Sequence, residues 1–278
     1  MKSPFAAFLR LELADALRSR WVAFASLLYL GLAGAFIWLG LRESTVLGFT
    51  GLSRVLLNLA NAVLVVFPLV VLIGTHSAVV HARTSGFCEL MLTQPVKRST
   101  WFFALLTSRL LVLVGPLIVL LVGCFVAAAF VEPEPGLAFI GLKSLAVCVA
   151  LVFAFVGIGL LISSLARSAE RAMVWALLVF VATSALHDVL LITALLKTAI
   201  PPQVVFGLAA LNPSEAARVG ILASVDPELS VLGPVGFWLA NSMGPSIALA
   251  IAVAYPLALG LVTTWRALRR TQLMDLIA

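Results

Sequence analysis

The sequence predicts an all-α integral membrane protein with six transmembrane helices, and three observations support this prediction. Of the 278 residues, 63% are hydrophobic and 11% are charged, whereas soluble domains have about 25% charged residues. Several apolar runs reach the roughly 20 residues that a helix needs to cross a bilayer. The basic residues, which give a net charge of +6, gather in alternate connecting segments, as they do in multi-pass membrane proteins.

Residues 1–20 are predicted to form an amphipathic helix that lies in the membrane interface. Apolar side chains recur at helical spacing from Phe5 to Leu17. The charged side chains mostly take the other side, and they are Lys2, Arg10, Glu12, Asp15 and Arg18. A helix of this pattern places its apolar face among lipids and its basic residues near the head groups. The segment lacks the short apolar core and the small-residue cleavage site of a signal peptide.

The six predicted spans account for most of the remaining chain. They are Val22–Leu41, Val55–Thr75, Leu110–Val131, Ser144–Ala166, Ala172–Leu196 and Met243–Trp265. In the fourth span, Gly157 and Gly159 are small enough to let another helix approach closely. The chain is expected to form a single membrane domain over residues 1–278, with no soluble domain attached.

The distribution of Lys and Arg predicts that both termini are cytoplasmic. With the N-terminus inside, the inner segments contain twelve Lys and Arg residues and the outer segments and span ends contain five. Inner loops of membrane proteins collect basic residues in this way. The basic residues do not alternate with aromatic ones, so the positive charge does not indicate a nucleic-acid partner.

The inner loop at residues 76–100 is predicted to contain two short helices. Residues before Gly86 suit one short helix, Gly86 interrupts it, and Glu89 to Leu92 begin a second one that Pro95 ends. A structured loop that projects from the membrane could transmit motion from a soluble partner to the spans.

The outer segment at residues 197–241 is predicted to fold as short helices on the outer side. It is rich in proline, and Asn212 can cap a helix that starts at Pro213 and has Glu215 in its first turn. Together with Arg218, these residues are the candidate contacts for a periplasmic partner.

No motif for catalysis or nucleotide binding is present in the sequence. The chain has no GxxxxGK[ST], HExxH or GxSxG motif, and its three histidines and three cysteines lack the spacing of a metal site. His187 and Asp188 form an ionisable pair inside the fifth span, which is a functional candidate because charge is costly there. Two interpretations remain open for this pair, a polar anchor at the outer end of the span and a role in a conduit.

The inner loop resembles the R-x-x-G-x-x-E-x-L-x-x-P-x-x-R signature of ABC-2-type transporter permeases. The matching residues are Arg83, Gly86, Glu89, Leu92, Pro95 and Arg98. In that family this loop is a coupling helix that contacts an ATPase, so the resemblance implies that these six residues contact one. It also implies a non-catalytic permease subunit of the bacterial inner membrane that binds no cofactor itself, with ATP and Mg²⁺ on the partner ATPase.

Within this family, the chain most resembles permeases that serve copper-site maturation of nitrous oxide reductase. The similar stretches are LRLELADALRSRW at Leu9–Trp21, LMLTQPVKR at Leu90–Arg98, HDVLL at His187–Leu191 and LNPSEAARVGIL at Leu211–Leu222. The resemblance implies a homodimer, two copies of a cytoplasmic ABC ATPase and a periplasmic copper-handling protein. Such permeases usually have an acidic stretch before the glycine, where this chain has residues 76–83, HSAVVHAR.

Two alternative functions remain open from the sequence. One is an exporter of the same fold for a small molecule or a lipid-like substrate, with a conduit at the dimer interface. The other is an intramembrane enzyme that uses His187 and Asp188.

Overall fold

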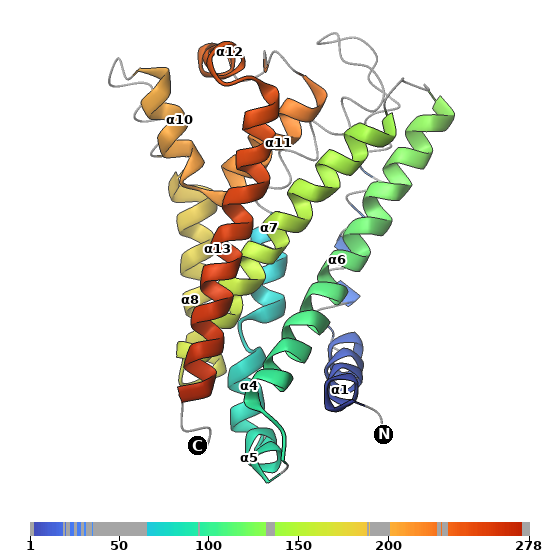
Figure 1. Ribbon diagram of the computed structural model, residues 1–278, viewed down its shortest axis with the longest axis vertical. Helices are drawn as coiled ribbons and strands as arrows, with labels where there is room; N and C mark the ends of the chain where they lie inside the picture. The colour runs from blue at the N-terminus through green and yellow to red at the C-terminus, as the bar shows by residue number, and fades with distance from the viewer. Residues whose placement is uncertain are drawn as a thin grey trace.

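The computed structural model is helical throughout the residues that it describes (Figure 1). The described residues are 3–18, 20, 23–24, 27–28, 31, 35, 66–93, 95–131, 137–187, 189, 201–226, 229 and 233–273. No strand occurs in these ranges, which agrees with the predicted all-α class.

Eleven helices are described along the chain. They are α1 (Pro4–Arg18), α4 (Ala78–Thr84), α5 (Phe87–Leu92), α6 (Arg98–Val131), α7 (Leu137–Leu165), α8 (Ala169–Val181), the π-helix η1 (Ala182–Leu186), α10 (Pro202–Ala210), α11 (Pro213–Val225), α12 (Gly233–Ser242) and α13 (Pro245–Leu273). Residues 66–75, which precede α4, are also helical.

Four helical segments in the described part of the chain are long and apolar enough to cross a membrane. They are Val66–Thr84, Arg98–Gly123, Ala138–Leu165 and Pro245–Leu273, and they correspond to the predicted second, third, fourth and sixth spans. The predicted first span lies mostly outside the described residues. Helices α8 and η1 form the first part of the predicted fifth span. Residues 190–196 of that span lie outside the described residues.

Three of these helices are longer than the hydropathy predicts, and one of them is α7, which begins at Leu137 where the fourth span was expected to begin at Ser144. The third span was expected to begin at Leu110, but α6 begins at Arg98, and α13 continues past Trp265 to Leu273. A helix satisfies its backbone hydrogen bonds internally, so it can continue beyond the apolar core wherever its side chains find packing partners.

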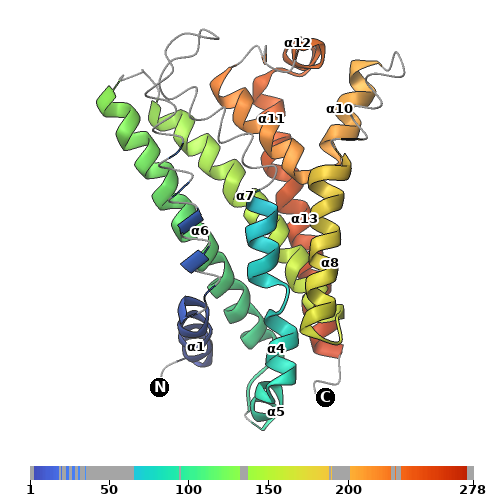
Figure 2. The ribbon, with the colours of Figure 1, turned by 180° about the vertical axis from the view of Figure 1, so that it is seen from behind.

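The long helices run between two ends of a bundle, as Figures 1 and 2 show. One end carries α1, α4, α5 and the last turns of α13, and we call it the α5 end. The other end carries α12 and the outer parts of α10 and α11, and we call it the α12 end. The predicted amphipathic helix is confirmed as α1, which packs against the first half of α6.

The centre of the bundle is α7, which packs against α13, α11, α6, α4 and α8. A Cβ atom at Gly157 would collide with Thr263 of α13 and would lie 2.8 Å from the carbonyl oxygen of Gly260. A Cβ at Gly159 would collide with Thr75. The prediction that Gly157 and Gly159 permit close helix approach is therefore confirmed, and α7 is closely approached on two sides, by α13 and by the segment before α4.

The predicted outer segment contains a helical hairpin that inserts into the bundle. Helix α11 packs against α7 and α13, and eleven of its thirteen residues are buried. Its buried surface includes Gly220, where a Cβ would collide with Ala252. The segment is helical, as predicted, but α11 is a packed internal element because its small residues let it fit between larger helices.

The tip of this hairpin is held by hydrogen bonds to two other helices, η1 and α13. The predicted cap is confirmed, since Asn212 Oδ1 accepts a hydrogen bond of 3.0 Å from the backbone N–H of Ser214. The Nδ2 atom of Asn212 donates to the carbonyl of Thr183 in η1. The hydroxyl of Tyr255 donates to the carbonyl of Leu211, and Tyr255 lies about 15 Å along α13 from its start, at 1.5 Å per residue.

We predict that Asn212 stabilises the hairpin through two separable hydrogen bonds. The variant Asn212→Ser keeps a capping oxygen but is too short to reach Thr183, whereas Asn212→Ala loses both bonds. Each bond should contribute about 1 kcal/mol, so thermal unfolding of the purified protein should rank wild type above Ser and Ser above Ala. Asn241→Ser, at an exposed position of α12, is the matched control. Equal unfolding temperatures for wild type and Asn212→Ser would contradict the role of the Thr183 bond.

Candidate functional site

The candidate site is the loop at the α5 end, formed by α4, Gly86 and α5. Gly86 has a φ of 74° and stands directly before α5. A residue with a Cβ is strained in this left-handed conformation, although space for the Cβ itself is open. The predicted interruption at Gly86 is therefore confirmed, and it lets α5 turn away from α4.

Helix α4 is capped by a side chain from α7. Its own preceding residue, Ser77, makes no side-chain cap. The hydroxyl of Ser163 accepts hydrogen bonds from the backbone N–H groups of Val79 at 2.9 Å and Val80 at 3.1 Å. The first N–H groups of a helix lack internal partners, so Ser163 both satisfies α4 and fastens it to the end of α7.

Arg83 strengthens this connection from inside the loop. Its Nη2 atom donates a hydrogen bond of 2.7 Å to the carbonyl of Ala166, which follows the last residue of α7. Only 9% of Arg83 is exposed. A guanidinium is favourable at a helix C-terminus because the carbonyls there are unpaired and the helix dipole is negative. The structure thus places Arg83 within the chain, where it joins α4 to α7.

The outward side of α5 carries other residues of the signature. Glu89 is exposed, and Leu90 beside it is 70% exposed. Pro95, in the connection to α6, is exposed as well. The side chain of Leu92 is not among the side chains that the structure describes. On the opposite side, Met91 and Cys88 are buried, and burial raises the pKa of the Cys88 thiol. The exposed residues form a surface available to a partner.

Arg98 connects the loop to the last helix. Its Nη1 atom donates a hydrogen bond of 3.1 Å to the carbonyl of Gln272 near the end of α13. The start of α6 and the end of α13 are thereby joined at the α5 end, so this residue of the signature also bonds within the chain.

An aromatic cluster joins α5 to α1 and α6, and the sequence reasoning did not identify it. The ring of Phe87 lies edge-on to Phe8 of α1 at 6.4 Å between centroids, and 6.1 Å from the ring of Trp101 in α6. Trp101 Nε1 donates a hydrogen bond of 2.8 Å to Oε1 of Glu12 in α1. The signal for this contact in the sequence was Glu12, a carboxylate between apolar residues of α1. A carboxylate that is buried needs a polar partner on a neighbouring element.

Glu12 is an unusual carboxylate because it is almost completely buried. It is 8% exposed, and this burial raises its pKa above the ordinary value near 4.5. The hydrogen bond from Trp101 and the positive charge of Arg109 act in the opposite direction. The charged residues of α1, Glu12 among them, were expected mostly on its solvated side. For Glu12 this prediction is wrong, because its side chain is buried and bonds to Trp101 of α6.

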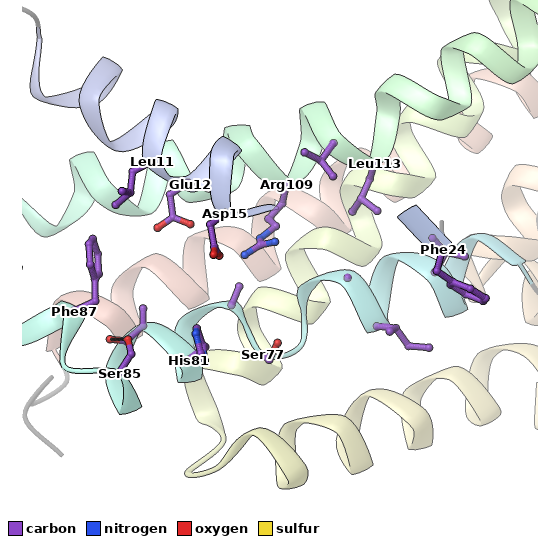
Figure 3. Close-up of a pocket in the computed structure, with 16 residues that line it drawn as sticks. Leu11, Glu12, Asp15, Phe24, Ser77, His81, Ser85, Phe87, Arg109 and Leu113 are labelled. Carbon is purple, nitrogen blue, oxygen red and sulfur yellow. Dashed lines mark hydrogen bonds between the residues drawn. The ribbon is translucent and has the colours of Figure 1, made fainter. Parts of the chain in front are cut away.

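A cavity of about 500 Å³ opens beside this cluster, between α1, α6 and the segment that leads into α4 (Figure 3). Glu12 and Asp15 come from α1, Arg109 comes from α6, and His81 lies on α4. Apolar side chains complete the wall, so the cavity combines opposite charges with an apolar surface.

The remaining candidate residues lie elsewhere in the bundle. Asn212, Pro213 and Glu215 are buried, and Glu215 makes an ion pair of 3.5 Å with Arg218, whose side chain is 29% exposed. The structure therefore places these four on the inserted hairpin and not on an exposed outer face.

The intramembrane pair is only half described. His187 follows η1, and its Nε2 atom is buried without a hydrogen-bond partner among the described residues. Asp188 lies outside them. The described ranges contain no group of three His, Cys, Asp or Glu residues arranged to hold a metal ion.

Comparisons with known proteins agree with the signature of the loop. The model of the ABC-2 family transporter proteins matches residues 6–267. A probable ABC transporter permease protein NosY of Pseudomonas aeruginosa PAO1 is 28% identical over 264 residues, covering 87% of this chain and 94% of that relative. Its counterpart in Stutzerimonas stutzeri is 38% identical over 89 residues, which span 32% of each chain.

The family match extends over nearly the whole chain and includes the loop, the bundle and the inserted hairpin. Together with the apolar helices, they show that the chain is a multi-pass membrane protein and the non-catalytic membrane subunit of an ABC transporter. It belongs to the ABC-2 family of transporter proteins.

Proposed function

We propose that this permease couples ATP hydrolysis by a separate cytoplasmic ATPase to movement of its membrane helices. The protein would lie in the bacterial inner membrane as a homodimer, with six spans per chain and both termini in the cytoplasm. The α5 end would then face the cytoplasm. The observation that carries this proposal is that one loop at this end combines an exposed surface with bonds to the helices around it.

The contacts of the loop define a route for the motion. A partner that pushes on Glu89 and Leu90 would displace α5, whose Phe87 packs on α1 and α6. Helix α4 would transmit the same displacement to α7 through the bonds of Ser163 and Arg83. Because packed interiors deform little, the helices at the loop would move together.

The same route leads to the opposite end of the bundle. Helix α7 packs along α13 and α11, and close contacts at Gly157 and Gly220 leave these helices little room to slide separately. A displacement of α7 would therefore reach the α10–α11 hairpin. On this proposal the hairpin changes its position relative to η1 and Tyr255, and a periplasmic partner responds to the α12 end.

We further propose that the complex serves copper-site maturation of nitrous oxide reductase. The support is the similarity to permeases named NosY and the stretches that resemble them, above all Leu211–Leu222. On this proposal the ATPase is NosF-like and the periplasmic copper-handling partner is NosD-like. Asn212, Pro213, Glu215 and Arg218 would influence that partner through the position of the hairpin, since three of the four are buried in this chain.

We predict that the docking surface is the exposed side of α5. Glu89→Lys should lower the amount of co-purified ATPase about tenfold or more, because reversed charge at an interface removes an attraction and adds a repulsion. The measurement is affinity purification of the tagged permease with the ATPase co-expressed. Ser246→Lys, which places a lysine at an exposed position of the α12 end, should change nothing. Undiminished co-purification with Glu89→Lys would disprove docking at this surface.

The function in copper-site maturation predicts a specific defect in the reductase. Deleting the gene in its host should leave nitrous oxide reductase present in the periplasm but low in copper, as measured by metal analysis of the purified enzyme. The wild-type gene should restore the copper content and the Glu89→Lys gene should not, because the ATPase would no longer drive the permease. A reductase with full copper in the deletion strain would refute this function while leaving ATPase coupling intact.

We predict that Glu12 serves α1 as a hydrogen-bond acceptor and not as a charge. Glu12→Gln keeps an oxygen for Trp101 Nε1, whereas Glu12→Leu leaves the buried N–H unpaired at a cost of about 1–3 kcal/mol. Unfolding at pH 7 is followed by tryptophan fluorescence. The unfolding temperature of Glu12→Gln should be at least that of wild type, and that of Glu12→Leu should be well below both.

The pH dependence follows from the raised pKa of Glu12. The folded state binds this proton more tightly than the unfolded state, so the contribution is fully present below the unfolded value near 4.5. It is lost as the pH rises through the higher folded pKa. Wild type should therefore lose stability relative to Glu12→Gln as the pH rises from about 4 toward neutrality. A constant difference between the two proteins over this range would contradict the assignment.

A further inference from the structure

The cavity between α1, α6 and the segment leading into α4 contains charges of both signs. Figure 3 shows Arg109 from α6 and Asp15 from α1 on one side of the cavity, and Ser77 and His81 on the other. Arg109 interacts electrostatically with Glu12 and with Asp15. The second carboxylate, Glu12, already accepts the indole N–H of Trp101 at one oxygen. Arg109 and Asp15 therefore offer one cation and one anion to a ligand.

The guanidinium of Arg109 has unused hydrogen-bonding capacity. Its Nε atom is buried and has no hydrogen-bond partner among the described residues. Buried polar atoms in native proteins are almost always paired with protein, water or ligand. An oxyanion is the natural partner for a guanidinium, since its planar donors match carboxylate and phosphate oxygens. Arg109 thus indicates the anionic part of a ligand.

The rest of the wall indicates that the ligand also has an apolar part. Val70, Ile73, Val112 and Leu113 line the cavity on the side of the long helices, and Leu11 lines it on α1. The cavity volume of about 500 Å³ is within the range of sites for small ligands. The exposed side of α1 includes Phe5, Leu11 and Leu17, which suits a helix at the lipid interface. The cavity therefore lies where an interfacial helix meets the spans.

We propose that this cavity binds a phospholipid whose head group contains both a phosphate and a primary ammonium. The phosphate lies at Arg109, the ammonium lies at Asp15, and an acyl chain follows Val112 and Leu113. A phosphoethanolamine head group has this combination of charges. A purely anionic head group would satisfy Arg109 but would bring no cation to the carboxylate of Asp15.

The test measures lipid binding to the purified full-length protein in detergent after delipidation. Native mass spectrometry follows titration with phosphatidylethanolamine, with phosphatidylglycerol of the same acyl chains and with water-soluble glycerophosphoethanolamine. We expect one phosphatidylethanolamine per chain, bound about tenfold more tightly than either of the others. Equal affinity for phosphatidylglycerol would overturn the head-group assignment. Equal affinity for glycerophosphoethanolamine would show that the ligand is a soluble zwitterion, and that also overturns the proposal.

Two variants assign the binding to the named charges. Asp15→Asn, an exposed position that keeps its shape, should weaken phosphatidylethanolamine binding about tenfold and leave phosphatidylglycerol binding equal or stronger. Arg109→Gln should weaken the binding of both lipids. Arg10→Gln, an exposed residue of α1 outside the cavity lining, is the matched control and should bind as wild type does. Unchanged binding by Asp15→Asn, with an unchanged unfolding temperature, would refute the proposed site.

Discussion

The structure depends on one connection, the attachment of α4 to the end of α7. Two backbone N–H groups of α4 bind the hydroxyl of Ser163, and the guanidinium of Arg83 binds the carbonyl of Ala166. These bonds satisfy helix-end groups that would otherwise lack partners. A hydrogen bond from a charged donor contributes about 1.5–3 kcal/mol, more than a neutral one. The loop is therefore firmly joined to the central helix of the bundle, so a force applied to the loop would be transmitted to α7.

The packing around α7 extends this connection through the bundle. Glycines at positions 157 and 260 bring α7 and α13 into close contact, and Gly220 does the same for α11 and α13. Close-packed helices of this kind lose stability when a side chain is added and resist independent movement. The hairpin tip is held by polar bonds from Asn212 and Tyr255. Polar bonds can exchange partners during a motion more readily than a packed interface can be rebuilt, so on the proposed function the tip would be the part that moves.

Local patterns in the sequence predicted the local structure well. The cap at Asn212, the turn at Gly86 and the close approach at Gly157 each depend on one residue type and its immediate neighbours. The burial of Arg83 and Glu12 could not be predicted in this way. Their partners, Ala166 and Trp101, lie 83 and 89 residues away in the chain. Charged side chains are usually exposed, and only the tertiary fold reveals the exceptions. The internal position of α11 was missed for the same reason.

The burial of Arg83 also explains why the segment before Gly86 can lack acidic residues. Val79, Val80 and Arg83 of this segment are buried against the end of α7. Carboxylates there would face the unpaired carbonyls and the negative end of the dipole of α7, which is unfavourable. In this chain the segment therefore serves packing, and α4 itself presents little surface for a partner. On the proposed function, recognition of an ATPase is left to α5, where Glu89 would supply a carboxylate and Leu90 an apolar contact, since both side chains are exposed.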